Sequence, residues 1–90
     1  MKRGPVHLIG LGGIGMSGLA RLYLSEGYAV QGSDVKGSEI LTELEWLGVK
    51  VHIGHDAAHV EGARTVVYSS SIPEDHPERA EAVRRGLNVI

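Results

Sequence analysis

The chain has 90 residues, which is enough for one domain with one hydrophobic core. It carries 9 basic and 11 acidic residues without a basic run, a balance that argues against nucleic acid as a partner. It contains no cysteine, which excludes disulfides and sulfur-ligated zinc sites. No apolar run is long enough for a signal peptide or a membrane span, so we expect a cytoplasmic domain without a membrane partner.

Short β-branched runs alternate with helical patterns, as they do in parallel sheets with crossover helices. Strands are expected at residues 6–10, 29–33, 50–53, 64–69 and 88–90. Right-handed crossovers then favour a Rossmann-like, doubly wound α/β sheet of five parallel strands in the order 3-2-1-4-5. Because the fifth strand runs to the last residue, we interpret residues 1–90 as the N-terminal domain of a longer protein.

Three helices are expected between these strands, and residues 55–60 allow at most one or two further turns. The first helix has an apolar stripe at helical spacing: Met16, Leu19, Ala20, Tyr23 and Leu24. Ser38 is a candidate N-cap for the second helix. The third is expected to start at the pattern Asp75-x-x-Glu78. Its apolar residues recur at near-helical spacing: Ala80, Val83 and Leu87.

The motif Gly10-x-Gly12-x-x-Gly15 follows the first predicted strand and opens the first predicted helix. In such a motif the first glycine makes the turn and the second lets a diphosphate approach the backbone. The third is expected to let helix and strand pack closely. The helix N-terminus adds free N–H groups and a partial positive charge, so this loop predicts a phosphate-binding site.

Two polar groups follow neighbouring strands at the same end of the predicted sheet. Asp34 lies about 20 residues after Gly15, where a carboxylate accepts hydrogen bonds from a sugar hydroxyl or a base. The alternative is that Asp34 only caps a turn. Ser69, Ser70 and Ser71 end the fourth strand, where their hydroxyls suit phosphate or sugar oxygens or serve ordinary turn chemistry.

The histidines need separate interpretations. His55 and His59 are spaced like a metal-binding pair, but no third ligand is evident, so no metal site is predicted. His55 follows the third strand, where it can approach a nucleotide base. His7 and His52 lie inside strands and are expected to be strand histidines whose hydrogen bonds are satisfied within the fold. Trp46 lies off the apolar stripe of the second helix, so we expect it to be partly exposed or covered by a missing domain.

The sequence around the glycines is more specific than the bare spacing. The run Gly10-Leu11-Gly12-Gly13-Ile14-Gly15-Met16-Ser17-Gly18 closely resembles the start of the Mur ligases of bacterial cell-wall synthesis, in the branch that adds L-alanine to UDP-N-acetylmuramate. The resemblance extends over the whole chain, through Gly32-Ser33-Asp34, Leu47-Gly48, Ile53-Gly54-His55, Val67-Tyr68-Ser69-Ser70 and Pro77-Glu78. Ser71 and His76 depart from the family pattern, in which alanine and asparagine are usual.

The resemblance implies that this first domain binds the UDP part of the substrate. ATP and magnesium would bind a central domain, and a third domain would help to bind L-alanine. The chain contains no G-x-x-x-x-G-K-[ST] motif, so neither catalytic residues nor a cofactor are expected within it. By position, the resemblance assigns the diphosphate to the amides of Gly12, Gly13, Ile14 and Gly15. It places Asp34 towards the uridine with His55 nearby, and Ser69 and Ser70 on the phosphate side.

Three alternatives remain open on the sequence. The glycine spacing and Asp34 also fit the NAD-binding domain of an oxidoreductase. A non-catalytic module that senses a nucleotide would have about this length. Within the resembling superfamily, the ligase that recycles murein tripeptide is a closer rival.

Overall fold

The computed structural model describes residues 2–90 and contains one five-stranded parallel sheet. The strands are β1 (Arg3–Ile9), β2 (Tyr28–Asp34), β3 (Lys50–Ile53), β4 (Thr65–Val67) and β5 (Asn88–Val89). The helices are α1 (Ile14–Ser25), α2 (Glu39–Trp46), the 3₁₀ turn η1 (Ala57–Val60) and α3 (Pro77–Arg84). The strand order is β3-β2-β1-β4-β5 and every pairing is parallel, which confirms the predicted topology.

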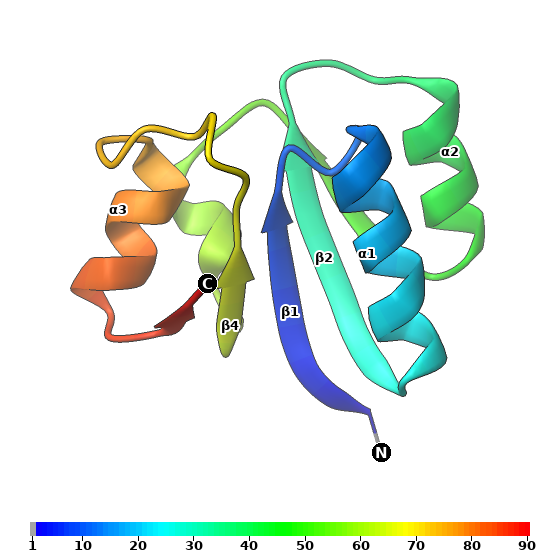
Figure 1. Cartoon of the computed structure of the whole chain (residues 1–90), viewed down its shortest axis with the longest axis horizontal. Coiled ribbons are helices and arrows are strands. Elements are labelled where there is room, and N and C mark those ends of the chain that lie inside the picture. The colour runs from blue at the N-terminus through cyan, green and yellow to red at the C-terminus, as the bar shows by residue number, and fades with distance from the viewer. Residues whose placement is uncertain (1) are drawn as a thin grey trace.

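The helices cover the two faces of the sheet separately, as the doubly wound topology requires. Figure 1 shows α1 and α2 on one side of the strands and α3 on the other. Strand order reverses at β1, which pairs with β2 on one side and β4 on the other. Because β1 and β4 point the same way, the loops that follow them lie side by side at one end of the sheet. We call this the carboxyl end; open α/β sheets bind ligands there.

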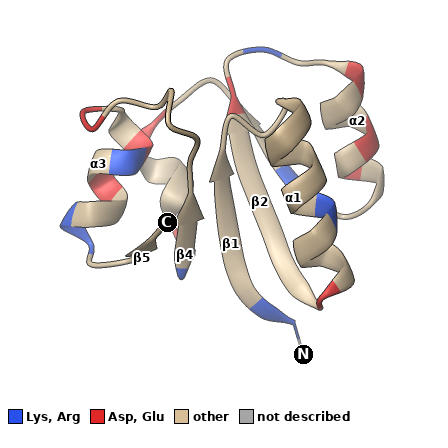
Figure 2. Ribbon diagram, viewed as in Figure 1, with Lys and Arg blue, Asp and Glu red and all other residues tan. Residues whose placement is uncertain are grey.

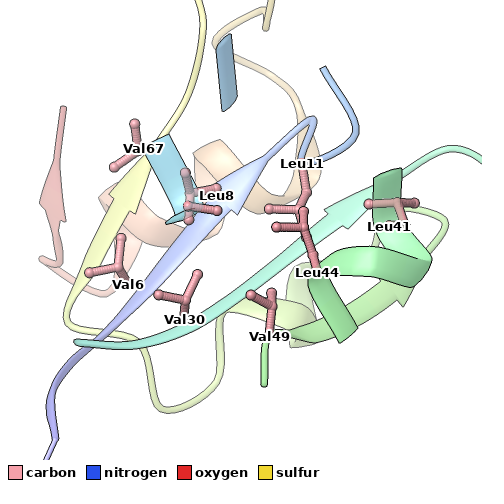
Figure 3. Close-up of a cluster of buried hydrophobic side chains, with 9 residues drawn as sticks. Val6, Leu8, Leu11, Val30, Leu41, Leu44, Val49 and Val67 are labelled. Atoms are coloured by element: carbon pink, nitrogen blue, oxygen red, sulfur yellow. The ribbon is translucent and has the colours of Figure 1, made fainter. Parts of the chain in front are cut away.

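One hydrophobic core lies between the sheet and the helices α1 and α2. Val6 and Leu8 of β1 point into it, together with Val30 of β2, and all three are at most 4% exposed. Leu41 and Leu44 meet them from α2 (Figure 3). The predicted stripe of α1 packs here as well, with Ala20 fully buried and the other four members partly buried. The 3.6-residue period of that helix therefore did predict its buried face.

The opposite face of the sheet carries a smaller apolar cluster. Ile9 and Val66 form it with Val60 of η1 and Ala82 of α3. Since successive side chains of a strand point to opposite faces, His7 lies on this side next to Ile9. His7 is completely buried, and so this face mixes apolar packing with buried polar groups.

The structure corrects the prediction for the third helix. Its N-cap is His76, whose Nδ1 accepts from the backbone N–H of Glu78 at 3.1 Å, so Asp75 is not the cap. Val83 is 64% exposed, and the residues of α3 that are buried are Glu78 and Ala82. Of the residues with the predicted spacing, Leu87 packs against the smaller apolar cluster, whereas Ala80 and Val83 are exposed, because the face that α3 turns to the sheet carries Glu78 and Ala82.

Two other expectations concern the surface. Ser38 caps α2 as predicted, with its Oγ accepting from Leu41 N at 3.3 Å. Trp46, at the end of the same helix, is 86% exposed. Within residues 2–90, none of the helices has the length and apolar character needed to cross a bilayer.

Candidate functional site: the glycine loop and the carboxyl end of the sheet

The turn between β1 and α1 is fixed to the neighbouring strand β2. Gly10 has φ of 83°, a conformation that favours glycine, and it ends β1. The amides of Gly10 and Leu11 both donate to the carbonyl of Ser33 at 2.9 Å. Leu11 is fully buried in the core below. These contacts hold the first residues of the loop in place, and they therefore fix the direction in which α1 begins.

The amides of the glycine loop fall into two groups. Gly12 N donates to Oδ2 of Asp34 at 2.7 Å, and Gly13 N donates to the carbonyl of Gly10 at 3.0 Å. The next three amides (Ile14, Gly15 and Met16) find no acceptor among residues 2–90. They form the first turn of α1, where backbone N–H groups have no partner within the helix. The open donors thus begin at Ile14.

The loop carries no side-chain charge of its own. Residues 10–18 contain neither lysine nor arginine, and Figure 2 shows the β1–α1 loop without a charged residue. An anion at this place would meet backbone N–H groups and the positive end of the α1 dipole.

The structure separates the glycines that the fold needs from those that it does not. A Cβ on Gly12 would lie 2.7 Å from Oδ2 of Asp34, so this glycine makes room for the carboxylate. A Cβ on Gly15 would meet nothing within 4 Å, which contradicts the predicted helix–strand packing role. Gly32 of β2 makes room for its own neighbours, because a Cβ there would lie 2.6 Å from the carbonyl oxygen of Leu8 in β1 and 2.9 Å from the Leu11 side chain. Gly15 therefore leaves open space beside the free amides.

Asp34 and His55 lie in one row with the loop at the carboxyl end. Besides Gly12 N, the Asp34 carboxylate accepts from Val35 N at 2.7 Å through Oδ1. The Asp34 carbonyl accepts from Gly54 N at 2.7 Å, which fixes the start of the segment that carries His55. The Asp34 side chain thus braces the glycine loop, and its local contact is with the next amide, Val35 N, so the capping of a turn stays a prediction.

The serines after β4 stand on the other side of the crevice. Ser69 and Ser70 are exposed, and Ser69 Oγ lies 2.8 Å from Ser71 Oγ. Ile72 N donates to the Ser69 carbonyl at 3.0 Å, so the segment forms a hydrogen-bonded turn. Arg79 of α3 holds the loop in place through a 2.7 Å hydrogen bond to the Ile72 carbonyl. The hydroxyls are available there, and their contact with phosphate stays a prediction.

A buried polar cluster behind this row escaped the sequence analysis. The carboxylate of Glu78, which has no exposed surface, accepts from His7 Nε2 at 2.6 Å and Ser33 Oγ at 2.5 Å. On its other oxygen it accepts from Nδ1 of His55 at 2.9 Å and Nδ1 of His59 at 3.1 Å. His7 is thus the satisfied strand histidine that was predicted, whereas His52 is half-buried, makes no side-chain hydrogen bond within residues 2–90 and stacks on the ring of His59. We call Glu78 and its four side-chain donors the Glu78 cluster.

Hydrogen bonding decides the charge of Glu78. Burial alone would raise the pKa of the carboxyl group, but hydrogen bonds from His7, Ser33, His55 and His59 together lower that pKa far below its usual range. The side chain is therefore a carboxylate at neutral pH. No periodic pattern of the sequence predicts a buried carboxylate. The only signal was an acidic residue on the third predicted helix.

One group of three side chains in residues 2–90 has the spacing of a metal site. Ligand atoms of His55, His76 and Glu78 lie within 4.8 Å of one another. Burial, with His55 nearby, lowers the pKa of His76, so its ring is neutral at pH 7. Because Nδ1 of His76 accepts from Glu78 N, its proton sits on the buried, unpartnered Nε2. That nitrogen has no lone pair for a metal, so this geometry does not favour one.

The doubly wound sheet, with a glycine loop leading into an open helix N-terminus, defines a Rossmann-like α/β domain. The family profile described as "Mur ligase family, catalytic domain" matches residues 5–90. The chain belongs to the Mur ligase family.

Individual relatives agree with this assignment. The UDP-N-acetylmuramate–L-alanine ligase of Nocardioides sp. is 53% identical over 89 residues, which are 99% of this chain and 20% of that protein. Among solved structures, a UDP-N-acetylmuramate–alanine ligase from Thermotoga maritima superposes with a TM-score of 0.91 at 29% identity, over 97% of this chain and 20% of its own. A UDP-N-acetylmuramate:L-alanyl-γ-D-glutamyl-meso-diaminopimelate ligase from Neisseria meningitidis superposes with a TM-score of 0.87 at 32% identity. The match covers 97% of this chain and 28% of that protein. The chain thus spans about a fifth of the curated relative.

Proposed function

We propose that this chain binds the UDP part of UDP-N-acetylmuramate, as the N-terminal domain of an ATP-dependent ligase that joins L-alanine to that substrate in peptidoglycan synthesis. The observation that carries the proposal is the open first turn of α1. Its three unpartnered amides, Ile14, Gly15 and Met16, face the carboxyl end of the sheet, where Gly15 leaves room for a diphosphate. Diphosphate oxygens are acceptors that match these donors.

Among the predicted diphosphate contacts, the amides of Ile14 and Gly15 are favoured over those of Gly12 and Gly13. The latter two donate within the chain, to Asp34 and to Gly10. We infer that Gly12, which has no side chain, allows the Asp34 carboxylate to approach and brace the loop. The lone pairs of the carboxylate that the loop does not use would then accept a hydrogen bond from a nucleoside hydroxyl or N–H. Ser69 and Ser70 would approach the diphosphate from the β4 side.

The family relationships favour L-alanine as the amino acid over a murein peptide. Curated alanine ligases of Nocardioides, Symbiobacterium thermophilum and Caulobacter are 53%, 55% and 60% identical to this chain, whereas the two solved structures, an alanine ligase at 29% and a peptide ligase at 32%, do not separate the two substrates. In the whole enzyme, ATP with Mg²⁺ would bind outside this domain and activate the muramyl carboxylate for attack by the amine. Such an enzyme would work in the cytoplasm, where the nucleotide-linked precursors are made.

Titration calorimetry on this chain tests the proposal with four ligands: UDP, UDP-N-acetylmuramate, NADH and ATP. We expect heat from both UDP ligands and weaker or no binding of NADH and ATP. NADH that binds as tightly as UDP would favour the oxidoreductase alternative and overturn the proposal. Absence of UDP binding by a chain with a native circular dichroism spectrum would also overturn it.

A further inference from the structure

The Glu78 cluster connects five separate parts of the chain to one carboxylate. His7 lies on β1, Ser33 on β2, His55 in the β3–η1 segment and His59 on η1, while Glu78 itself comes from α3. Asp56 N adds a further hydrogen bond to Glu78 at 3.2 Å. A carboxylate only accepts hydrogen bonds, so each partner must present a proton to it. The cluster therefore fixes where the protons of its histidines are.

The proton position on His7 follows from its second partner. Gln31 Nε2 donates to the carbonyl of His59 at 2.7 Å, which identifies that atom as the amide nitrogen. The same nitrogen lies 3.0 Å from Nδ1 of His7, so Nδ1 is an acceptor and the His7 proton sits on Nε2. His7 is thus a neutral donor, used entirely inside the cluster, with no nitrogen left for a ligand.

His55 has the opposite arrangement. Its Nδ1 faces Glu78 at 2.9 Å and Ser33 Oγ at 3.1 Å. Because the Ser33 hydroxyl donates to Glu78, and Glu78 is a carboxylate, Nδ1 of His55 must carry a proton. In the neutral ring Nε2 is then a bare acceptor, and it makes no hydrogen bond within residues 2–90. The His55 side chain remains 19% exposed.

The surroundings keep the His55 ring in this orientation. Gly54, the preceding residue, donates to the backbone carbonyl of Asp34, which ties the segment that carries His55 to the end of β2. The ring of His76 packs edge-on against it with centroids 4.3 Å apart. The ring of His59, the other Nδ1 donor to Glu78, is stacked instead on His52 at 4.2 Å. Of the three histidines bound to Glu78, His55 is the one that lies just beyond the carboxyl end of a strand, two residues after β3.

We propose that Glu78 is a positioning residue of the nucleotide site: it holds His55 in the Nδ1–H tautomer, so that Nε2 accepts a hydrogen bond from an N–H or O–H group of the nucleoside. This inference rests on the proposed binding of UDP. A phosphate oxygen is itself an acceptor and would be repelled by a bare Nε2. His55 is therefore directed to the uracil N–H or a ribose hydroxyl, and the diphosphate is left to the amides of α1.

Nitrogen-15 NMR of the histidine rings tests the tautomer without any ligand. In the unmodified chain, at a pH where the ring is neutral, we expect His55 to carry its proton on Nδ1 with Nε2 bare, and UDP to perturb Nε2 without protonating it. A His55 that carries its proton on Nε2 in the free chain would overturn the positioning role. A ring that becomes doubly protonated when UDP binds would show that His55 faces phosphate, and would overturn the assignment to the nucleoside.

Glu78→Gln tests the positioning step, and Glu81→Gln on the same helix is its matched control. Glu81 pairs with Arg84 and Arg85 at the surface and has no contact with a histidine. We expect Glu78→Gln to lose the fixed Nδ1–H signature of His55 and to weaken UDP binding roughly three- to ten-fold, as for one neutral hydrogen bond. Glu81→Gln should leave both unchanged. Equal behaviour of the two variants would overturn the proposal.

A second variant decides the matter if Glu78→Gln does not fold. His55→Asn keeps an N–H group near the position of Nδ1, so it preserves a donor to Glu78 while it removes Nε2. We expect this variant to fold and to lose UDP affinity by the same three- to ten-fold. Parental affinity would overturn the role of Nε2. If the unmodified chain binds no UDP at all, the proposed function fails. The tautomer of His55 in the ligand-free chain still tests, independently of UDP, whether Glu78 fixes the His55 ring.

Discussion

Replacing Gly15 with alanine separates ligand binding from folding in the first turn of α1. A Cβ at this position would meet no atom within 4 Å, so the fold has room for it. Because each Cα–Cβ bond of a helix tilts towards the N-terminus, the methyl group would project towards the open amides. It would thus occupy the space from which a diphosphate must reach Ile14 and Gly15.

The expected effects on stability and on binding have opposite signs. Alanine in place of an exposed helical glycine stabilises by about 0.5–1 kcal/mol, which raises Tm by roughly 2–8 °C in a domain of this size. Loss of one charge-assisted hydrogen bond costs about 1.5–3 kcal/mol, so the Kd for UDP should rise about 10- to 150-fold. A chain that is more stable yet binds less well is the diagnostic result.

Gly18→Ala is the matched control, since Gly18 lies on the same helix and its Cβ would also meet nothing within 4 Å. Both variants should melt at a higher temperature by circular dichroism, but only Gly15→Ala should lose UDP affinity in titration calorimetry. If Gly15→Ala binds UDP like the parent, the diphosphate does not lie on this turn and the reasoning is refuted. Equal losses in both variants would point to an indirect effect of helix stability.

Four further outcomes are expected. Asp34→Ala removes the acceptor of the 2.7 Å bond from Gly12 N and should cost about 1–2 kcal/mol of unfolding free energy by urea titration; an unchanged midpoint would show that Asp34 does not brace the loop. Burial lowers the pKa of His52 and His76 below 6.5, so protons favour the unfolded chain and stability should fall as the pH drops through that value; a flat profile from pH 7 to 5.5 would contradict this. The pKa of Glu78 is also lowered, from 4.5, so a further loss should begin below about that pH and be missing in Glu78→Gln, as urea titrations at pH 5 and 3.5 would reveal. Finally, this chain should not release phosphate from ATP, because it lacks a P-loop lysine, and alanine-dependent phosphate release by the pure chain would disprove that.

The order of the elements and one of the two cores followed from the sequence alone. The stripe on α1 is a short-range pattern, which reports on local geometry and on the face that is buried. Parallel strands joined by helices then allow few topologies, since crossovers are right-handed. The position of the glycine loop at the carboxyl end of β1 was predictable for the same reason.

The assignment of roles within the site needed the tertiary structure. The glycine motif assigns Gly12 to the approach of a diphosphate and Gly15 to helix–strand packing, yet the fold places the Asp34 carboxylate against Gly12 and open space beside Gly15. A spacing rule does not record these neighbours, because Asp34 is 22 residues away from Gly12 in the chain.

The Glu78 cluster was decided by the fold alone. His7 and Glu78 are 71 residues apart, and each has an ordinary local interpretation, as a strand histidine and as an acidic residue in the first turn of a helix. They meet because α3 covers the face of β1 that carries His7 rather than the face that carries Leu8. Burying a carboxylate is tolerable only where enough donors converge on it, and that convergence is a property of packed elements, which no local period of the sequence records.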